Sequence, residues 1–268
     1  MIATILAKEV SQKIDIAGQF LNTSSGLSGE TISSLIIVGI ICLLSIYVGI
    51  RARFADPLKK PKGILFLVEV GVNFFDGLVE SLMGKNYRGF GGFMMAIATY
   101  LFISFIWGLT GLPSPVVYLA TPLSLGLVTF VCIHANAIRF NKFRYFKRYI
   151  EPLPFFLPVN LISMWAPLLS LTMRLFGNAL AGWTVMTLIY SVLGGAGNTL
   201  ITFVVDGVEQ NLTFGSVITP FITPALHAYF DLFSGLIQTV VFLFLSMIFI
   251  ANEGPEDEID ELSEKGGR

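Results

Sequence analysis

One arginine stands alone inside a long apolar stretch of this sequence. Arg174 is the only charged residue between Pro152 and Val205. Its guanidinium stays positively charged at any biological pH. At membrane depth this charge costs from about 2.5 to more than 10 kcal/mol, so a carboxylate, a water-filled cavity or both should face it. The competing interpretation is a structural arginine whose side chain extends to the lipid headgroups.

The neighbours of this arginine form a polar row at helical spacing. Residues four apart lie on the same face of a helix, which places Ser170, Arg174 and Asn178 together, followed by the small residues Ala181/Gly182. Small residues allow a partner to approach closely in a membrane. The row therefore predicts a polar face that another membrane segment contacts.

The last apolar stretch carries a second polar row. Its members follow one another at i, i+4, i+7 and i+11: His227, Asp231, Ser234/Gly235 and Gln238. Two facing polar rows inside lipid require water between them, because unsatisfied polar groups cost several kcal/mol each there. Water, carboxylate, imidazole and amide together are typical of a proton path. For Gln238 alone, a purely structural hydrogen bond to Asn178 is the alternative.

The fixed charge of Arg174 suggests how such a path would work. It cannot release its proton, so it blocks proton leakage, and it favours the ionised form of any carboxylate brought near it. A mid-membrane carboxylate of a second protein would release its proton on nearing Arg174 from one side and regain one after passing it. Each charge that crosses the membrane delivers about 2.3 kcal/mol per 100 mV, which can bias rotation.

The composition indicates an integral membrane protein. Of the 268 residues 54% are hydrophobic and 13% are charged, with a mean hydropathy of +0.76, whereas soluble domains are about 25% charged. The net charge of −1 gives no indication of a nucleic-acid partner. Cys42 and Cys132 lie in apolar runs without metal or disulfide spacing, so no cofactor is expected. The first residues lack the pattern of a cleaved signal peptide.

The lengths of the apolar stretches predict an all-α membrane fold with about five transmembrane helices. The expected spans are approximately 33–50, 90–110, 117–138, 159–190 and 216–250, within a single membrane domain of residues 33–250. The last two are longer than an upright span requires, so we expect them to tilt strongly. An outer loop is expected between them, over residues 194–215. Residues 1–32 form a polar N-terminal segment and 251–268 an acidic tail.

One apolar segment is predicted to lie on the membrane rather than cross it. Residues 64–83 carry Glu69, Asn73, Asp76 and Glu80 on one helical face. Three acids are expensive in lipid, so the pattern favours an interfacial amphipathic helix.

Basic clusters predict the orientation of the chain. Residues 51–62 and 139–148 are rich in lysine and arginine, which places both loops in the cytoplasm, the N-terminus outside and the C-terminus in the cytoplasm. The aromatic residues between the basic residues of the second cluster are interpreted as interface anchors, not as a nucleic-acid site.

The residues around the arginine resemble a known family. Ser170-Leu171 followed by Arg174-Leu175-Phe176-Gly177-Asn178 and Ala181-Gly182 is similar to the signature of subunit a of F-type ATP synthases. Gln238 and the spacing of the spans from about residue 33 to 250 extend the resemblance. It implies a non-catalytic stator subunit that conducts protons for ATP synthesis through two offset half-channels, with its last two helices forming a hairpin against a c ring. The implied partners are the c-subunit ring, peripheral-stalk b subunits, the lipid bilayer and, indirectly, the F1 head.

The resemblance also implies roles for individual residues. Arg174 would be the essential arginine, Asn178 and Gln238 its polar partners, and Asp231 the carboxylate of the outer half-channel, assisted by His227 one turn away. The sequence departs from the family pattern at two places. Trp183 stands where the family usually has an acid or a histidine, and Ser163-Met164 lies where many members carry an acid. The residues of the inner half-channel are therefore not predicted.

Two other functions compete with that of a stator subunit. An ion-coupled secondary transporter would use an intramembrane pair of Arg174 and Asp231, but the polar rows lie only in the C-terminal half, without an inverted repeat. An intramembrane serine protease using Ser234 with His227 fits less well, because no glycine-flanked nucleophile turn is present. The expected location is a bacterial plasma membrane, with an organellar inner membrane as the alternative. The sequence does not choose between H⁺ and Na⁺.

Overall fold

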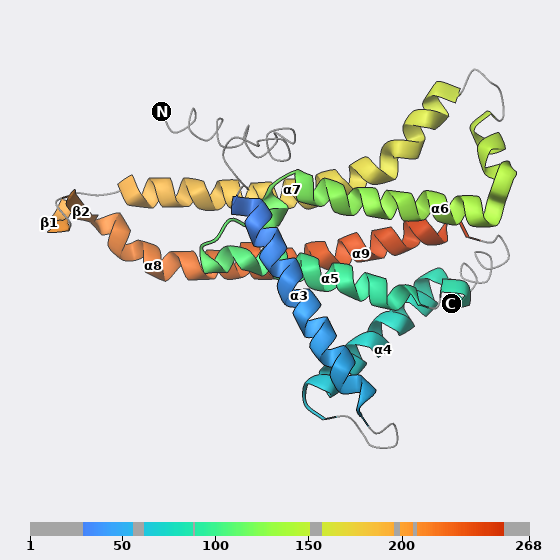
Figure 1. Cartoon of the computed structure of the whole chain (residues 1–268). Helices are drawn as coiled ribbons and strands as arrows, with labels where there is room; N and C mark the ends of the chain where they lie inside the picture. Colours follow the sequence, from blue (N-terminus) through green and yellow to red (C-terminus); the bar gives the residue numbers. More distant parts are fainter. Residues whose placement is uncertain are drawn as a thin grey trace, which may run out of the picture.

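The computed structural model describes residues 29–55, 62–87, 89–150, 157–195, 199–205 and 208–254. Its α-helices are α3 (Gly29–Arg53), α4 (Ile64–Met83), α5 (Phe90–Ile106), α6 (Ala120–Ile150), α7 (Leu157–Gly195), α8 (Phe214–His227) and α9 (Gly235–Ala251) (Figure 1). Short 3₁₀ turns are η1 (Lys85–Tyr87), η2 (Trp107–Thr110) and η3 (Pro115–Val117), and a π-helical segment, η5 (Ala228–Ser234), joins α8 to α9.

Five helical stretches of the described residues are long and apolar enough to cross a membrane. They are Gly29–Arg53, Phe90–Thr110, Ala120–Phe140, Ile162–Leu193 and Val217–Ala251. These stretches overlap the five expected spans, and the predicted all-α membrane fold is confirmed.

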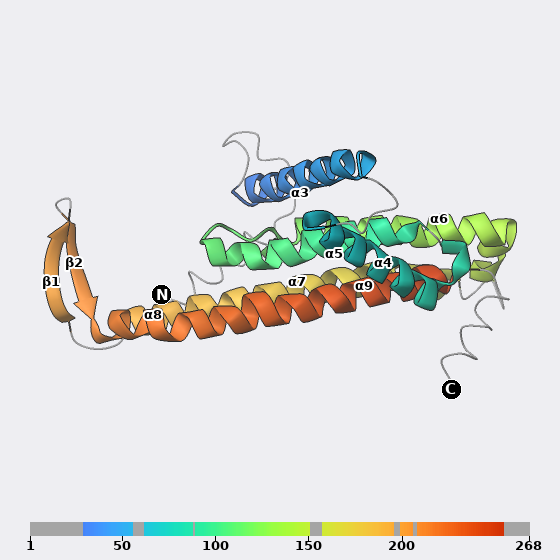
Figure 2. The ribbon, with the colours of Figure 1, turned by 90° about the horizontal axis from the view of Figure 1, so that it is seen from below.

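The two longest helical stretches lie side by side and extend along most of the molecule. Helix α7 lies beside the continuous α8–η5–α9 rod, and α6 packs along α7 (Figures 1 and 2). The shared core joins α4, α5, α6, α7 and α9, with Leu101, Leu175 and Phe242 among its most buried side chains. Pro167 lies inside α7, and the first turns of this helix bend away from the rest (Figure 1). A proline inside a helix removes a backbone hydrogen bond and causes such a bend.

Glycines let the core helices approach closely. A Cβ atom at Gly235 of α9 would lie only 2.6 Å from Cβ of Phe105 on α5. At Gly126 of α6 a Cβ atom would collide with the Thr172 hydroxyl of α7. Lipid provides no hydrophobic drive between helices, so close packing at small residues contributes much of the association energy.

A buried amide ties the ends of three elements together. Asn136 of α6 is 8% exposed, and its Nδ2 donates to the Tyr87 hydroxyl at 2.6 Å and to the backbone carbonyl of Ile250 at 2.8 Å. This side chain therefore joins α6 to η1 and to the last turn of α9.

The last span is continuous over the residues expected, and it contains a feature that the sequence did not predict. Residues 228–234 form a π-helical segment, in which hydrogen bonds run to the fifth residue and the turn is wider. The spacing of apolar residues does not reveal the π-helical segment, because a single wider turn hardly changes the pattern of a helix that is apolar on nearly every side. Asp231 lies within the segment, and π-segments occur frequently at functional sites.

The expected outer loop at 194–215 contains a β-hairpin. Strands β1 (Thr199–Val205) and β2 (Val208–Thr213) pair antiparallel, with Val205 opposite Val208 and an irregularity between Thr199 and Ile201. The hairpin projects beyond the ends of α7 and α8 (Figure 2). The expectation of a loop did not specify this hairpin. Asp206-Gly207, which follows a run rich in β-branched residues, is a dipeptide typical of hairpin turns.

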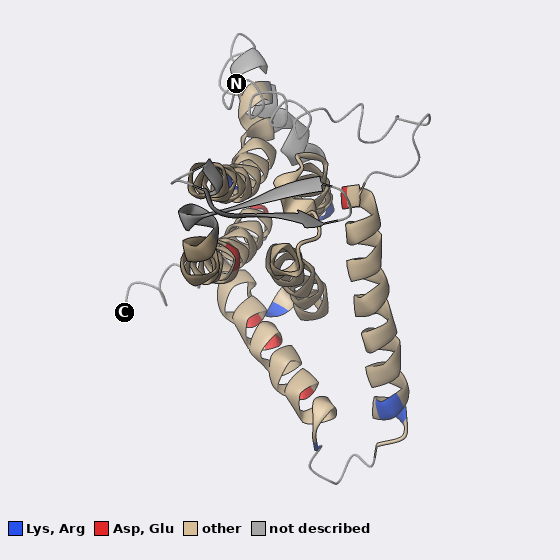
Figure 3. Cartoon of the chain, turned by 90° about the vertical axis from the view of Figure 1, so that its left-hand side faces the viewer, with Lys and Arg blue, Asp and Glu red and all other residues tan. Residues whose placement is uncertain are grey.

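Helix α4 spans the residues expected for the amphipathic helix. Its acidic residues Glu69, Asp76 and Glu80 are exposed, and acidic positions follow the length of α4 in Figure 3. The Asp76 carboxylate lies over Gly91 in the first turn of α5. A negative charge is favourable at this end of a helix, so Asp76 stabilises the junction of α4 and α5.

Candidate functional site

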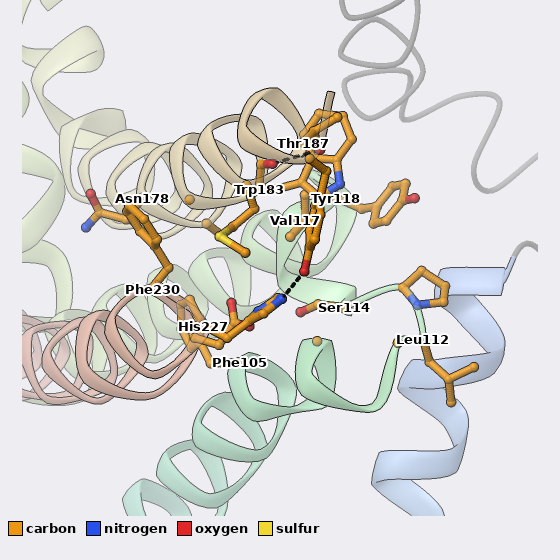
Figure 4. Close-up of a pocket in the computed structure, with 18 residues that line it drawn as sticks. Phe105, Leu112, Ser114, Val117, Tyr118, Asn178, Trp183, Thr187, His227 and Phe230 are labelled. Carbon is orange, nitrogen blue, oxygen red and sulfur yellow. Dashed lines mark hydrogen bonds and ion pairs between the residues drawn. The ribbon is translucent and has the colours of Figure 1, made fainter. Parts of the chain in front are cut away.

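A cavity of about 620 Å³ lies between the C-terminal end of α5 and the pair formed by α7 and the α8–η5 segment (Figure 4). Its walls carry aromatic and small residues together with a few polar groups. Asn178, Trp183 and Tyr190 come from α7, His227 and Asp231 from the last span, and Gly108 and Ser114 from the turns after α5. The few polar groups in its wall could each bind water, and the cavity is large enough for several water molecules.

Three polar side chains form a hydrogen-bonded chain along this cavity. The Tyr190 hydroxyl lies 2.8 Å from Nε2 of His227, and Nδ1 of His227 lies 2.5 Å from Oδ2 of Asp231. The side chains of His227 and Asp231 are 25% and 23% exposed. Asp231 also lies near Gly108, where a Cβ atom would come within 3.5 Å of Oδ2. The carboxylate is therefore bound on one side and open to the cavity on the other.

The two polar rows predicted from the sequence meet at one hydrogen bond. Nδ2 of Asn178 on α7 donates to Oε1 of Gln238 on α9. Gln238 is only 3% exposed, and its Nε2 has no hydrogen-bond partner among the described residues. Asn178 lines the cavity and contacts Gln238, so it connects the cavity to the buried amide.

Arg174 lies outside this hydrogen-bonded group. It is exposed on α7, and no hydrogen bond or ion pair joins it to another residue in the part of the chain that the structure describes. The residues that follow on the same helical face are also exposed: Asn178, Ala181, Val185, Leu188 and Val192. An unpaired arginine on an apolar, exposed helix face inside a membrane requires an external partner.

The structure thus brings four of the five predicted site residues together. Asn178, His227 and Asp231 line the cavity, and Gln238 is bonded to Asn178, whereas Arg174 faces away from the chain. Sequence reasoning missed Tyr190, because no spacing rule connects it to His227 on another helix. Among the described residues, no group of three or more His, Cys, Asp or Glu could hold a metal ion.

Comparison with known proteins decides the family. The family model described as ATP synthase A chain matches residues 31–251, which cover all five apolar spans except the first two residues of the first span and include every predicted site residue. The chain belongs to the ATP synthase A chain family. It is therefore a non-catalytic membrane component of the F0 sector, as the sequence motif implied, and a multi-pass protein of the plasma membrane.

Curated relatives support this assignment over nearly the whole length. The chain is 28% identical to ATP synthase subunit a of Mycoplasma genitalium, over 98% of this chain and 96% of the relative. It is 30% identical to ATP synthase subunit a of Mycoplasma pneumoniae, over 79% and 74% of the two chains. A sodium ion specific subunit a from Propionigenium modestum is 28% identical, over 66% of this chain and 58% of the relative. Membership implies a complex with a c ring and b subunits.

Proposed function

We propose that this chain is the membrane stator subunit of a rotary F-type ATP synthase. In it, Arg174 mediates the exchange of protons between two offset half-channels and the carboxylates of a c ring, without giving up its own proton. The observation that carries the proposal is the exposure of Arg174 without an ion-pair partner in the described structure. The apolar face around it is suited to a helix of another subunit, and the charge is suited to a carboxylate on that helix.

The electrostatics of Arg174 give direction to the exchange. The guanidinium favours the ionised form of a ring carboxylate that comes close, and it cannot carry a proton across itself. A ring carboxylate therefore moves past Arg174 as a carboxylate and returns to lipid only after it is protonated again. The potential across the membrane supplies about 2.3 kcal/mol per charge and 100 mV, which biases this cycle.

The cavity at Asp231 is suited to the outer half-channel. It contains a carboxylate that water can reach, and it extends to Asn178, four residues from Arg174 on the same helix. Asn178 and Gln238 would pass hydrogen bonds between this cavity and the ring-facing surface. If the cavity opens to the outside of the membrane, the basic residues Arg51 and Arg53 at the end of α3 lie in the cytoplasm. Helix α4 then lies at the cytoplasmic interface, and the N-terminus is outside.

A secondary transporter built on an Arg174–Asp231 pair is less well supported. Such a pair needs the two side chains in contact, whereas the Asp231 carboxylate is bonded to His227 and Arg174 has no ion pair in the described chain. Asp231 is therefore satisfied from within its own helix.

The test is an Arg174→Ala variant in the assembled ATP synthase, measured as ATP-driven acidification of inverted membrane vesicles. We expect pumping to be abolished while the complex still assembles, because Arg174 makes no hydrogen bond or ion pair to the described residues. Arg53→Ala is the matched control, since Arg53 is also an exposed arginine, at the end of α3. Normal pumping by the Arg174 variant would refute the mechanism.

A further inference from the structure

Tyr190 is the outermost member of the hydrogen-bonded chain that ends at Asp231. It lies on α7, whereas His227 and Asp231 lie on the last span, so the bond from its hydroxyl to Nε2 of His227 joins the two long helices. We propose that Tyr190 is a positioning residue of the outer proton pathway, which holds His227 in the orientation and tautomer that place its Nδ1–H on Asp231. This inference rests on the proposed role of Asp231.

The chemistry of the three groups determines which nitrogen carries the proton. An ionised carboxylate can only accept hydrogen bonds, so with Asp231 in this form Nδ1 of His227 is the donor to it. Nε2 of the neutral ring is then an acceptor, and only a donor such as the Tyr190 hydroxyl can satisfy it at 2.8 Å. Without that hydroxyl, the ring could turn or change tautomer, and Asp231 would lose its donor.

Few other titratable groups near the imidazole of His227 could take the place of Tyr190 or Asp231 as its hydrogen-bond partner. Four titratable side chains line the cavity, namely Tyr118, Tyr190, His227 and Asp231, and no lysine, arginine or glutamate is among its described lining residues. The rings of Tyr190 and His227 lie 6.2 Å apart, so the contact is made through the hydroxyl and not by stacking. The hydroxyl and the carboxylate are thus the groups that fix the ring on its two sides.

The tautomer can be observed directly, because the chain has only two histidines, His134 and His227. In the assembled complex with ¹⁵N-labelled histidine, a His134→Gln background leaves the His227 signals alone in this chain. We expect Nδ1 protonated and Nε2 unprotonated and hydrogen-bonded. Tyr190→Phe should move the Nε2 signal towards that of a nitrogen without a donor. If the His227 ring of the wild type is protonated on Nε2 alone, the proposal is overturned. This measurement uses the wild-type residues Tyr190 and His227, so it does not depend on whether Tyr190→Phe folds.

The functional test measures passive proton conduction through the membrane sector after the soluble head is removed. Tyr190→Phe should slow conduction about fivefold to tenfold, as expected for one lost hydrogen bond in the conducting state. Ser191→Ala is the matched control, because this neighbouring hydroxyl donates only to its own helix at the Thr187 carbonyl, 2.9 Å away. The control should conduct as the wild type does.

A double-mutant cycle separates this inference from the proposed function. If Tyr190 acts through His227, adding Tyr190→Phe to His227→Gln should cause no further loss of conduction. Losses that multiply, or normal conduction in Tyr190→Phe, would overturn the role of Tyr190 even if Asp231→Asn still slows conduction. Normal conduction in Asp231→Asn would instead refute the outer half-channel itself.

Discussion

Replacing Gln238 with leucine separates a structural role of the buried amide from a role in proton transfer. Gln238 is 3% exposed, accepts one hydrogen bond from Asn178 and leaves its own Nε2 without a partner. Leucine has a similar size and no polar atoms. If the amide had only a structural role, its removal should change the stability little. The free energy gained from its hydrogen bond to Asn178 nearly equals the free energy that its unpaired N–H group costs.

The magnitudes support that cancellation. A hydrogen bond between membrane helices contributes on average about 0.6 kcal/mol and at most about 1.7 kcal/mol. An unpaired buried N–H group costs about 1–3 kcal/mol, and leucine removes this cost. We therefore expect Gln238→Leu to change stability by less than about 1 kcal/mol. Asn178→Ala, which leaves the Gln238 amide buried without its partner, should be the more destabilising change by about 1–3 kcal/mol.

Proton transport should respond in the opposite way. The leucine interrupts the polar row between the cavity and the ring-facing surface, and the loss of one hydrogen-bonding group worth about 1.4 kcal/mol in the transfer state slows transport about tenfold. The assays are thermal unfolding of the purified complex and ATP-driven acidification of inverted vesicles. Wild-type pumping by Gln238→Leu would show that the Asn178–Gln238 bond is structural. A large loss of stability would refute the cancellation.

Two further predictions concern packing. Gly235→Ala should destabilise the chain by about 1–3 kcal/mol and lower the amount of assembled protein in membranes, because the new Cβ atom would lie 2.6 Å from Phe105. Gly92→Ala is the control: its Cβ atom would lie in open space on α5, so this variant should have no such effect. Asn136→Ala should destabilise the complex by about 1–3 kcal/mol and lower its melting temperature, because it removes the hydrogen bonds to Tyr87 and Ile250. Thr99→Ala is the control, since the Thr99 hydroxyl bonds within α5. Equal melting temperatures for the two variants would contradict the reasoning.

The β-hairpin and the π-segment show where periodicity stops being informative. The hairpin had a local sequence signal, namely Asp206-Gly207 directly after the β-branched run of residues 199–205, which the expectation of a loop between two spans did not use. The π-segment had no such signal, because its wider turn depends on how Asp231 and its neighbours pack against α5 and α7. Local propensity is therefore sufficient for the first feature and insufficient for the second.

The sequence by itself determined the membrane class and the approximate spans, and it singled out the candidate functional residues. It could do so because lipid penalises each charge and each unsatisfied polar group, so Arg174 and Asp231 stand out in any apolar stretch. Only the tertiary structure decided which groups meet. Tyr190 reaches His227 across two helices, Asn178 reaches Gln238, and Arg174 faces outward without a partner in the described chain. These contacts depend on the rotation and tilt of each helix, which packing between helices sets and helical periodicity alone does not.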